Sequence, residues 1–254
     1  MVSLVGVLQG RRGPQELVLV RHAESMGNLA DAEARDADAD RLELSARDAD
    51  VELSPNGEEQ GRTLGRWVAG LDDATKPDLV VSSPYRRAAD TARAAVDELG
   101  IEVLLDERLR ERDLGLFDGL TGKGIRGRYP EEAKRRSHVG KFYYQPPSGE
   151  SWADVVLRVR SLLADLREGY DGRRVWLFTH QAVIMSFRYA LEGLDEAELL
   201  EIDRSTQISN VSITRYLRDE DGLVLQEFAD DSHLSPGPAE KTREPDRAEE
   251  PQNA

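Results

Sequence analysis

The stretch Glu16–Asn28, with the sequence ELVLVRHAESMGN, decides how the rest of the chain is interpreted. Its apolar part, Leu17 to Val20, is rich in valine and too short for a helix, which is typical of a parallel strand buried on both faces. Arg21 and His22 follow at the carboxyl end of this strand. Because ligands of open α/β sheets bind outside the carboxyl ends of the strands, this pair is predicted to lie where the chemistry takes place.

Three later strands are predicted, and each leads into a loop with a charged or histidine side chain. They are Asp78 to Ser82, followed by Arg86 and Arg87; Ile101 to Leu105, which leads to Glu111; and Arg174 to Phe178, followed by Thr179 and His180. Strands that alternate with helices give an α/β domain with a mostly parallel sheet. Two arginines, two histidines and one carboxylate are therefore expected to converge on one sheet edge.

The remaining elements follow from caps and periodicity. Ser54 caps a helix predicted over Pro55 to Ala69, with the proline at its first position. Further helices are predicted from the Ser83 turn to Leu99, from Ser151 to Leu166 and from Ala182 to Leu191, and a terminal hairpin over Gln207 to Arg218 and Leu223 to Phe228.

Composition restricts the class of protein. The 254 residues are 39% hydrophobic and 33% charged, with a net charge of −15, which argues against nucleic acid or an anionic membrane as the main partner. The sequence has no cysteine, which excludes disulfides, a thiolate nucleophile and cysteine-bound metal. No apolar run approaches the ~20 residues of a membrane span, and the amino terminus is unlike a signal peptide, so a cytoplasmic location is expected.

Residues 16–234 form the predicted domain. Four segments lie outside its predicted strands and helices. Residues 1–15 form an N-terminal extension. The acidic segment from Leu29 to Asp50 is interpreted as an exposed, partly helical insertion that is solvated rather than functional. Residues 117–148 are rich in glycine, proline and aromatic residues and are interpreted as a lid. Residues 235–254 are predicted to be a disordered acidic tail.

The converging residue types suit phosphoryl transfer. Arginine binds phosphate through a planar, permanently charged fork, and a neutral histidine held on one ring nitrogen offers the other as a nucleophile. Arg21, Arg87 and His180 could stabilise charge on the equatorial oxygens of the transition state. Glu111 is placed to protonate the leaving oxygen. The sequence shows neither a metal-ligand cluster nor a glycine-rich phosphate loop.

The motifs in order resemble those of the histidine phosphatase superfamily, which has the phosphoglycerate-mutase-like fold. The resemblance covers roughly residues 16–234. The matching segments are Leu19–Ser25, with Ala23 in place of the usual glycine; Asn28; Leu53–Gln60; Ser82–Ala88; Leu109–Gly115; Gly149–Ser151; and Thr179–Ile184.

This resemblance implies a three-layer α/β/α fold with a mostly parallel central sheet. It implies His22 as a phosphohistidine nucleophile, with Arg21, Arg87 and His180 binding the phosphoryl group and Glu111 as general acid and then base. The carbonyl of Ala23 is expected to orient the His22 ring. Phosphate or substrate contacts are further expected from Asn28, Gln181, Arg135, Arg136 and Tyr143, with no metal and no cofactor.

Three functions are left open by the sequence. The first is a metal-independent phosphatase that hydrolyses a small phosphomonoester through a phosphohistidine. The second is a cofactor-dependent phosphoglycerate mutase, and the third is an inactive family member with a binding role. The sequence does not choose the substrate, because specificity is set by the site and its lid. The terminal hairpin is either a homodimer interface or a sheet edge.

Overall fold

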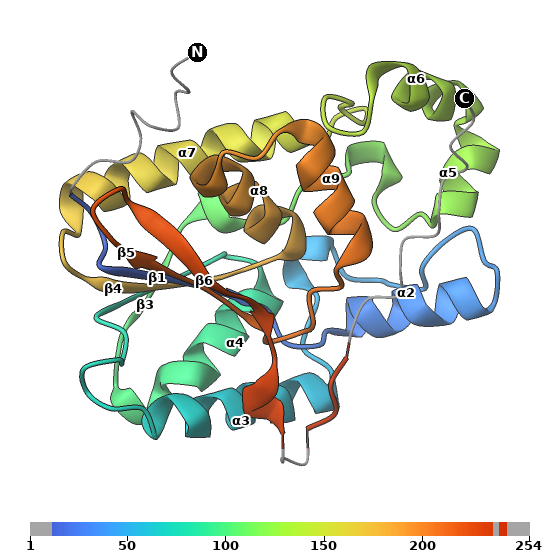
Figure 1. Cartoon of the computed structure of the whole chain (residues 1–254). Coiled ribbons are helices and arrows are strands. Elements are labelled where there is room, and N and C mark those ends of the chain that lie inside the picture. Colours follow the sequence, from blue (N-terminus) through green and yellow to red (C-terminus); the bar gives the residue numbers. More distant parts are fainter. Residues whose placement is uncertain (1–11, 236–238, 243–254) are drawn as a thin grey trace.

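The computed structural model describes residues 12–235 and 239–242, which form a six-stranded mixed sheet between two layers of helices (Figure 1). The strand order is β3-β2-β4-β1-β5-β6. The first four strands are parallel to one another, β5 is antiparallel to β1, and β6 is antiparallel to β5. The strands are β1 (Glu16–Arg21), β2 (Leu79–Ser82), β3 (Val103–Leu105), β4 (Arg174–Thr179), β5 (Ile213–Arg218) and β6 (Leu223–Asp230). The predicted three-layer α/β/α class is confirmed.

Helices cover both faces of the sheet. Figure 1 shows α7 and α8 on one face and α3 and α4 on the other, whereas α2, α5 and α6 lie together at one end of the molecule. The helices are α2 (Met26–Asp36), α3 (Pro55–Ala69), α4 (Arg86–Val96), α5 (Gly122–Arg128), α6 (Pro130–Val139), α7 (Trp152–Gly169), α8 (Gln181–Glu192) and α9 (Glu196–Ser205). Short 3-10 turns are η1 (Asp48–Asp50), η2 (Asp97–Leu99), η3 (Glu107–Leu109), η4 (Gly115–Phe117) and η5 (Ser232–Leu234).

Strand β1 lies between two hydrophobic cores, one on each face of the sheet. Successive side chains of a strand point to opposite faces, so Leu17 and Leu19 pack with the residues of α7 and α8, while Val18 and Val20 pack with those of α3 and α4. All six residues of the strand are buried. This double burial fixes the position at which Arg21 and His22 leave the sheet.

The two predicted insertions are joined to each other. The amide of Leu42 donates to the carbonyl of Gly119 (2.9 Å), and the hydroxyl of Thr121 donates to the carbonyl of Ala39 (2.8 Å). Lys123 completes the contact through an ion pair with Asp38. The segment between α2 and η1 is therefore held against the start of residues 117–148, the predicted lid, as Figure 1 shows beside α5.

Most predicted elements are present, with shifted ends. The helix over Pro55–Ala69 is confirmed at both ends. Helix α2 begins three residues before the predicted insertion, because Ser25 and Asn28 form a reciprocal capping box. Helix α9 was not predicted, although Asp195 and Glu198 form the same kind of box at its start.

The chain ends fall partly outside the described residues. Of the predicted N-terminal extension, residues 12–15 are described, and the amide of Gln15 donates to the carbonyl of Arg173 (2.8 Å). Of the predicted disordered tail, residues 235 and 239–242 are described, and Gln60 donates to the carbonyl of Glu240 (2.7 Å) and to the hydroxyl of Thr242 (2.9 Å). The other tail residues lie outside the described range, where disorder stays a prediction. Within the described residues, every helix is too short or too polar to cross a bilayer.

Candidate active site

His22 lies at the carboxyl end of β1 with its ring held in one orientation. The residue is 4% exposed, and its amide donates to the carbonyl of Thr179 at the end of β4 (2.9 Å). Its Nδ1 lies 2.8 Å from the carbonyl oxygen of Ala23. Because a carbonyl only accepts, this contact puts the ring proton on Nδ1 and the lone pair on Nε2. The expectation that the Ala23 carbonyl orients the ring is confirmed.

The loop that follows His22 is braced from two helices. The buried amide of Ala23 donates to Oγ1 of Thr91 on α4 (3.0 Å), and the amide of Glu24 donates to Oε1 of Gln60 on α3 (2.8 Å). A Cβ at position Gly57 would lie 1.9 Å from the carbonyl oxygen of Glu24, so a glycine is required for α3 to approach this closely. The motif at residues 53–60 thus supports the loop that follows His22.

His180 lies opposite His22 and is completely buried. The two ring centroids are 5.1 Å apart. Nε2 of His180 lies 2.9 Å from Oγ of Ser83, and that oxygen already accepts from the amide of Tyr85 (3.2 Å). The Ser83 hydroxyl has one proton and one further lone pair, so it can partner Nε2 of His180 whichever ring nitrogen carries the proton. Within the described residues this Nδ1 is buried and makes no hydrogen bond.

The surroundings keep His180 neutral. Burial, and then the positive charge of Arg87, hold the pKa of His180 well below its usual value. A neutral imidazole with the proton on Nδ1 can donate one hydrogen bond without adding a full charge. Such a donor suits a phosphoryl oxygen held between the two histidines.

The two arginines are anchored in different ways. Arg21 is 1% exposed, and its Nη1 donates to the carbonyl of Ile208. Arg87, in the first turn of α4, has a side chain that is 7% exposed and forms an ion pair with Asp48. The guanidinium carbon of Arg87 also lies 5.2 Å from the centroid of the Tyr85 ring. The neighbouring Arg86 is 52% exposed and pairs with Glu52 instead.

Asp48 corrects one prediction. The segment from Leu29 to Asp50 was interpreted as solvated and without a part in the site, yet Arg87 donates to Asp48 at both its carbonyl and its carboxylate. The reason is the pairing of this segment with the start of the lid, which directs η1 toward α4.

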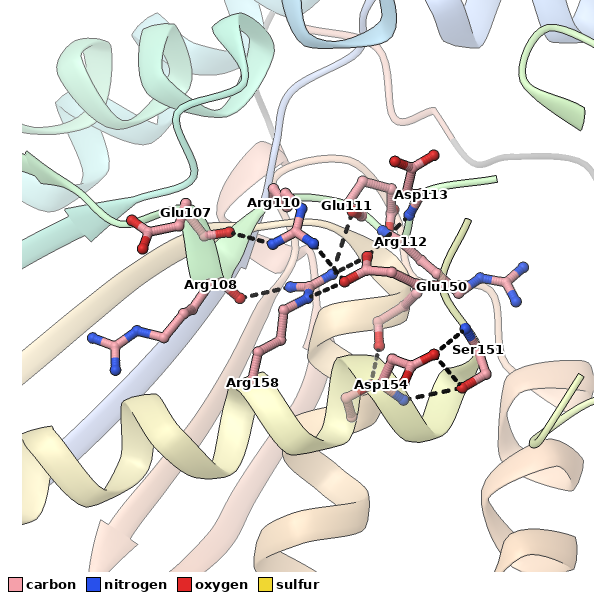
Figure 2. A network of polar contacts seen from close by, with 12 residues as sticks. Glu107, Arg108, Arg110, Glu111, Arg112, Asp113, Glu150, Ser151, Asp154 and Arg158 are labelled. Carbon is pink, nitrogen blue, oxygen red and sulfur yellow. Dashed lines mark hydrogen bonds and ion pairs between the residues drawn. The ribbon is translucent and has the colours of Figure 1, made fainter. Parts of the chain in front are cut away.

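Glu111 is half-buried on the loop between η3 and η4, and its carboxylate accepts from the amide of Arg112 (2.7 Å). Figure 2 shows that a larger network holds this loop. Arg158 on α7 donates to both carboxylate oxygens of Glu150 (3.0 and 3.1 Å) and to the carbonyls of Arg108 (2.6 Å) and Glu111 (3.3 Å).

Glu150, which lies beside Arg158 in Figure 2, binds the same loop at two further points. It accepts from Arg110 (2.5 Å) and from the amide of Asp113 (3.1 Å). Gly115, at a φ of 54°, closes the loop, since a Cβ there would lie 2.1 Å from the carbonyl oxygen of Pro147. The Glu150–Arg158 pair is thus the main support of the backbone that carries Glu111.

The side-chain amide oxygen of Asn28 binds the loop that follows His22. Oδ1 accepts from the amide of Ser25 (3.0 Å) and lies 3.4 Å from Nδ2 of Asn210. Asn210 also donates to the carbonyl of His22 (2.9 Å) and contacts Thr242. Asn210 therefore links His22, Asn28 and the segment 239–242.

The other four predicted substrate residues lie on α6, on α8 and in the segment before α7. Gln181 donates to Asp203 on α9 (3.2 Å). Tyr143 is 54% exposed and hydrogen-bonds Glu196, also on α9. Arg135 is exposed and Arg136 half-buried on α6. Substrate contacts by these four stay predictions. In the described part of the chain no group of three histidine, aspartate or glutamate side chains is arranged to hold a metal ion.

Sequence reasoning missed the residues that support the site. Ser83 and Gln60 lie inside quoted motifs and Thr91 lies in a predicted helix, so the positions of these residues were predicted but their contacts were not. Asp48 and Asn210 lie in segments without a motif. Their only signal was a polar side chain near a strand end or beside an insertion.

Comparison with known proteins agrees with this geometry. A family model for the histidine phosphatase superfamily (branch 1) matches residues 17–231. The chain belongs to the histidine phosphatase superfamily.

Individual relatives carry different activities. A 2,3-bisphosphoglycerate-dependent phosphoglycerate mutase of Rhizobium rhizogenes is 30% identical over 202 residues, which is 77% of this chain and 88% of the mutase. The mycobacterial glucosyl-3-phosphoglycerate phosphatase, solved with inorganic phosphate, is 27% identical with a TM-score of 0.67 and covers 87% of this chain and 100% of its own. A bifunctional protein of Mycobacterium tuberculosis is 35% identical over 171 residues, 59% of this chain, but the match spans only 44% of that protein's length.

Proposed function

We propose that this protein hydrolyses a small phosphomonoester through a phosphohistidine on His22, without a metal ion. The observation that carries the proposal is the pair of buried histidines, with the lone pair of His22 on Nε2 and the unpartnered Nδ1 of His180 beside it. A buried polar atom without a protein partner is costly unless a ligand satisfies it. A phosphoryl oxygen would do so.

The reaction has two steps. Nε2 of His22 attacks phosphorus, the N–P bond forms, and the P–O bond to the leaving group breaks while Glu111 gives that oxygen a proton. Glu111 then takes a proton from water, whose oxygen attacks phosphorus and releases inorganic phosphate from His22. Arg21, Arg87 and His180 stabilise the negative charge in both steps.

A phosphoglycerate mutase is the second candidate, because a mutase is among the relatives at 30% identity. A mutase returns the phosphoryl group from the histidine to the product, which requires that water be excluded. The two activities share the first step and differ in the acceptor. Free phosphate distinguishes hydrolysis from the interconversion of 2- and 3-phosphoglycerate.

The test is phosphate release from a broad panel of phosphomonoesters in the presence of a chelator. We expect release by the wild-type protein and its loss in His22→Ala, together with an acid-labile phosphoenzyme trapped on the wild type only. His138→Ala is the matched control, since His138 is exposed on α6. Release that needs a metal, or that survives in His22→Ala, would overturn the mechanism.

A further inference from the structure

The contact between Arg87 and Asp48 uses part of the arginine's donor capacity. Nη1 donates to the Asp48 carbonyl (2.7 Å) and to Oδ1 (2.9 Å), and Nη2 lies 3.4 Å from Oδ2. A guanidinium has five N–H donors. Nε and the second hydrogen of Nη2 therefore lie on the side of Arg87 that Asp48 does not cover, and they can bind two phosphoryl oxygens.

The same contact changes the charge of the site. The Asp48 carboxylate neutralises Arg87 and is itself 40% exposed. A phosphoryl group bound to Arg87 would thus lie one side chain away from a fixed negative charge. A substrate group on the Asp48 side of Arg87 would therefore lie close to this carboxylate.

Two further carboxylates, Asp113 and Asp118, are near enough for Asp118 to be affected by the charges of both Asp48 and Asp113. Burial first, and then the charges of Asp48 and Asp113, raise the pKa of the Asp118 carboxyl above its usual value. Burial and the charge of Asp48 likewise raise the pKa of Tyr85. The nearby Arg110 is bound to Glu150. Asp48 is therefore not the only carboxylate near Arg87, whereas on the side of His180 the charges of Arg87, Arg21 and Arg158 are positive.

Resting on the proposed function, we propose that Asp48 makes the site select phosphomonoesters whose remainder is neutral or cationic. A substrate with a carboxylate or a second phosphate beside the scissile ester is disfavoured. The reason is direct charge repulsion by an aspartate that the phosphate-binding arginine holds in place. Such selection also favours hydrolysis of monophosphates over a mutase cycle that needs a bisphosphorylated intermediate.

The test measures binding of three matched probes by calorimetry in a His22→Ala background, where turnover is blocked. The probes are phosphoethanolamine, 2-hydroxyethyl phosphate and phosphoglycolate, which differ only in an ammonium, a hydroxyl or a carboxylate at the same place. We expect phosphoglycolate to bind about tenfold more weakly than 2-hydroxyethyl phosphate. Asp48→Asn should reduce the ratio of the dissociation constants of phosphoglycolate and 2-hydroxyethyl phosphate by about fivefold to tenfold.

Glu52→Gln is the matched control. Glu52 pairs with the neighbouring Arg86 and is 61% exposed, so its removal should leave the three relative affinities unchanged. Equal binding of all three probes, or a ratio that Asp48→Asn does not alter, overturns the selection but leaves the phosphoryl site intact. Failure of all three probes to bind overturns the phosphoryl site itself. Because each ratio is internal to one variant, a general loss of stability does not imitate the expected result.

Discussion

The two halves of the site are built in different ways. The half around His22 and His180 lies at the ends of buried strands, and its supports are mostly neutral hydrogen bonds from α3, α4 and the loop before β5. The half around Glu111 is a loop outside the sheet, held by a network of arginines and carboxylates. The first half is positioned by the core, whereas the second is positioned by charge.

Substitutions in the two halves of the site should therefore have different effects. Core packing fixes a position within a narrow range, because interiors are densely packed. A loop held by an ion pair keeps its place only while both partners are present. The following experiments test this division, from the largest expected effect to the smallest.

The largest effect is expected at adjacent arginines in the first half. Arg87→Gln should lower kcat/KM by about a thousandfold, because a buried bidentate donor to the phosphoryl group is lost. Arg86→Gln, the exposed neighbour, should stay within about twofold of wild type, as is usual for exposed ion pairs. The measurement is steady-state hydrolysis of the best substrate of the panel. Equal losses in the two variants would contradict the assignment of Arg87.

In the second half, Glu150→Gln and Arg158→Gln should each lower kcat by about 10- to 100-fold with little change in KM, since the loop that carries Glu111 loses its support. Each should also cost about 3 kcal/mol of unfolding free energy, because a largely buried ion pair is broken.

The double variant should be no worse than the poorer single one, because the two residues act as one unit. Asp165→Asn serves as the control, since Asp165 lies on the same helix as Arg158 and its side chain, which pairs with Arg108, is 61% exposed. Its effect on kcat and on denaturant unfolding should be negligible. Fully additive losses in Glu150→Gln and Arg158→Gln would show that the pair does not act as a support.

The pH dependence of stability should report the buried histidine of the first half. The pKa of His180 is lowered in the folded state, so protonation favours the unfolded state. The contribution of neutral His180 to the free energy of unfolding is complete above the unfolded-state pKa of about 6.5. This contribution declines as the pH falls from there toward the folded-state pKa. Denaturant unfolding at pH 7.5 and at pH 5.5 should show this loss, and His180→Gln should reduce it.

His233 makes a second contribution of the same sign, because burial also lowers its pKa. His233→Gln should therefore reduce the pH dependence further, whereas the exposed His138→Gln should leave it unchanged. A steeper loss of stability on acidification in His180→Gln would contradict the folded-state pKa direction.

The smallest effect is expected for Thr91→Val. Its hydroxyl accepts from the amide of Ala23 and donates to the carbonyl of Arg87 (2.6 Å), so the nearly isosteric valine leaves a buried amide without a partner. We expect a loss of about 1–2 kcal/mol and a severalfold lower kcat. Thr75→Val, whose hydroxyl bond is exposed, should cost less than about 0.5 kcal/mol. An unchanged stability in Thr91→Val would mean that the loop is held by other contacts.

The first half of the site could be predicted from the sequence because its signals are local. A buried strand followed directly by Arg21 and His22, and another followed by His180, place side chains at one sheet edge by topology alone. The capped helix at Ser54 was predicted with correct ends for the same reason. Sheet and cap geometry depend on neighbouring residues, and so the pattern is visible along the chain.

The second half of the site was harder to predict from the sequence. Glu111 was found through its motif, but the ion pair between Glu150 and Arg158 gave no pattern, because many charged residues lie in the same stretch. Asp48 was misjudged since an acidic segment is usually solvated. Its contact depends on the pairing of two insertions, in which the bonded residues are 82 and 85 positions apart in the chain. Contacts between loops are set by tertiary structure, which local propensity does not encode.

The hydrogen bonds of Asn210 also bear on when the protein gains its activity during synthesis. Arg21 and His22 are among the first residues of the domain, yet their partners Ile208 and Asn210 lie 187 and 188 positions later. Contacts of such long range form late, because closing the intervening loop costs entropy before any contact is gained. A nascent chain that has already paired β1 with β4 therefore still lacks these supports of Arg21 and His22 until the region around residue 210 has left the ribosome.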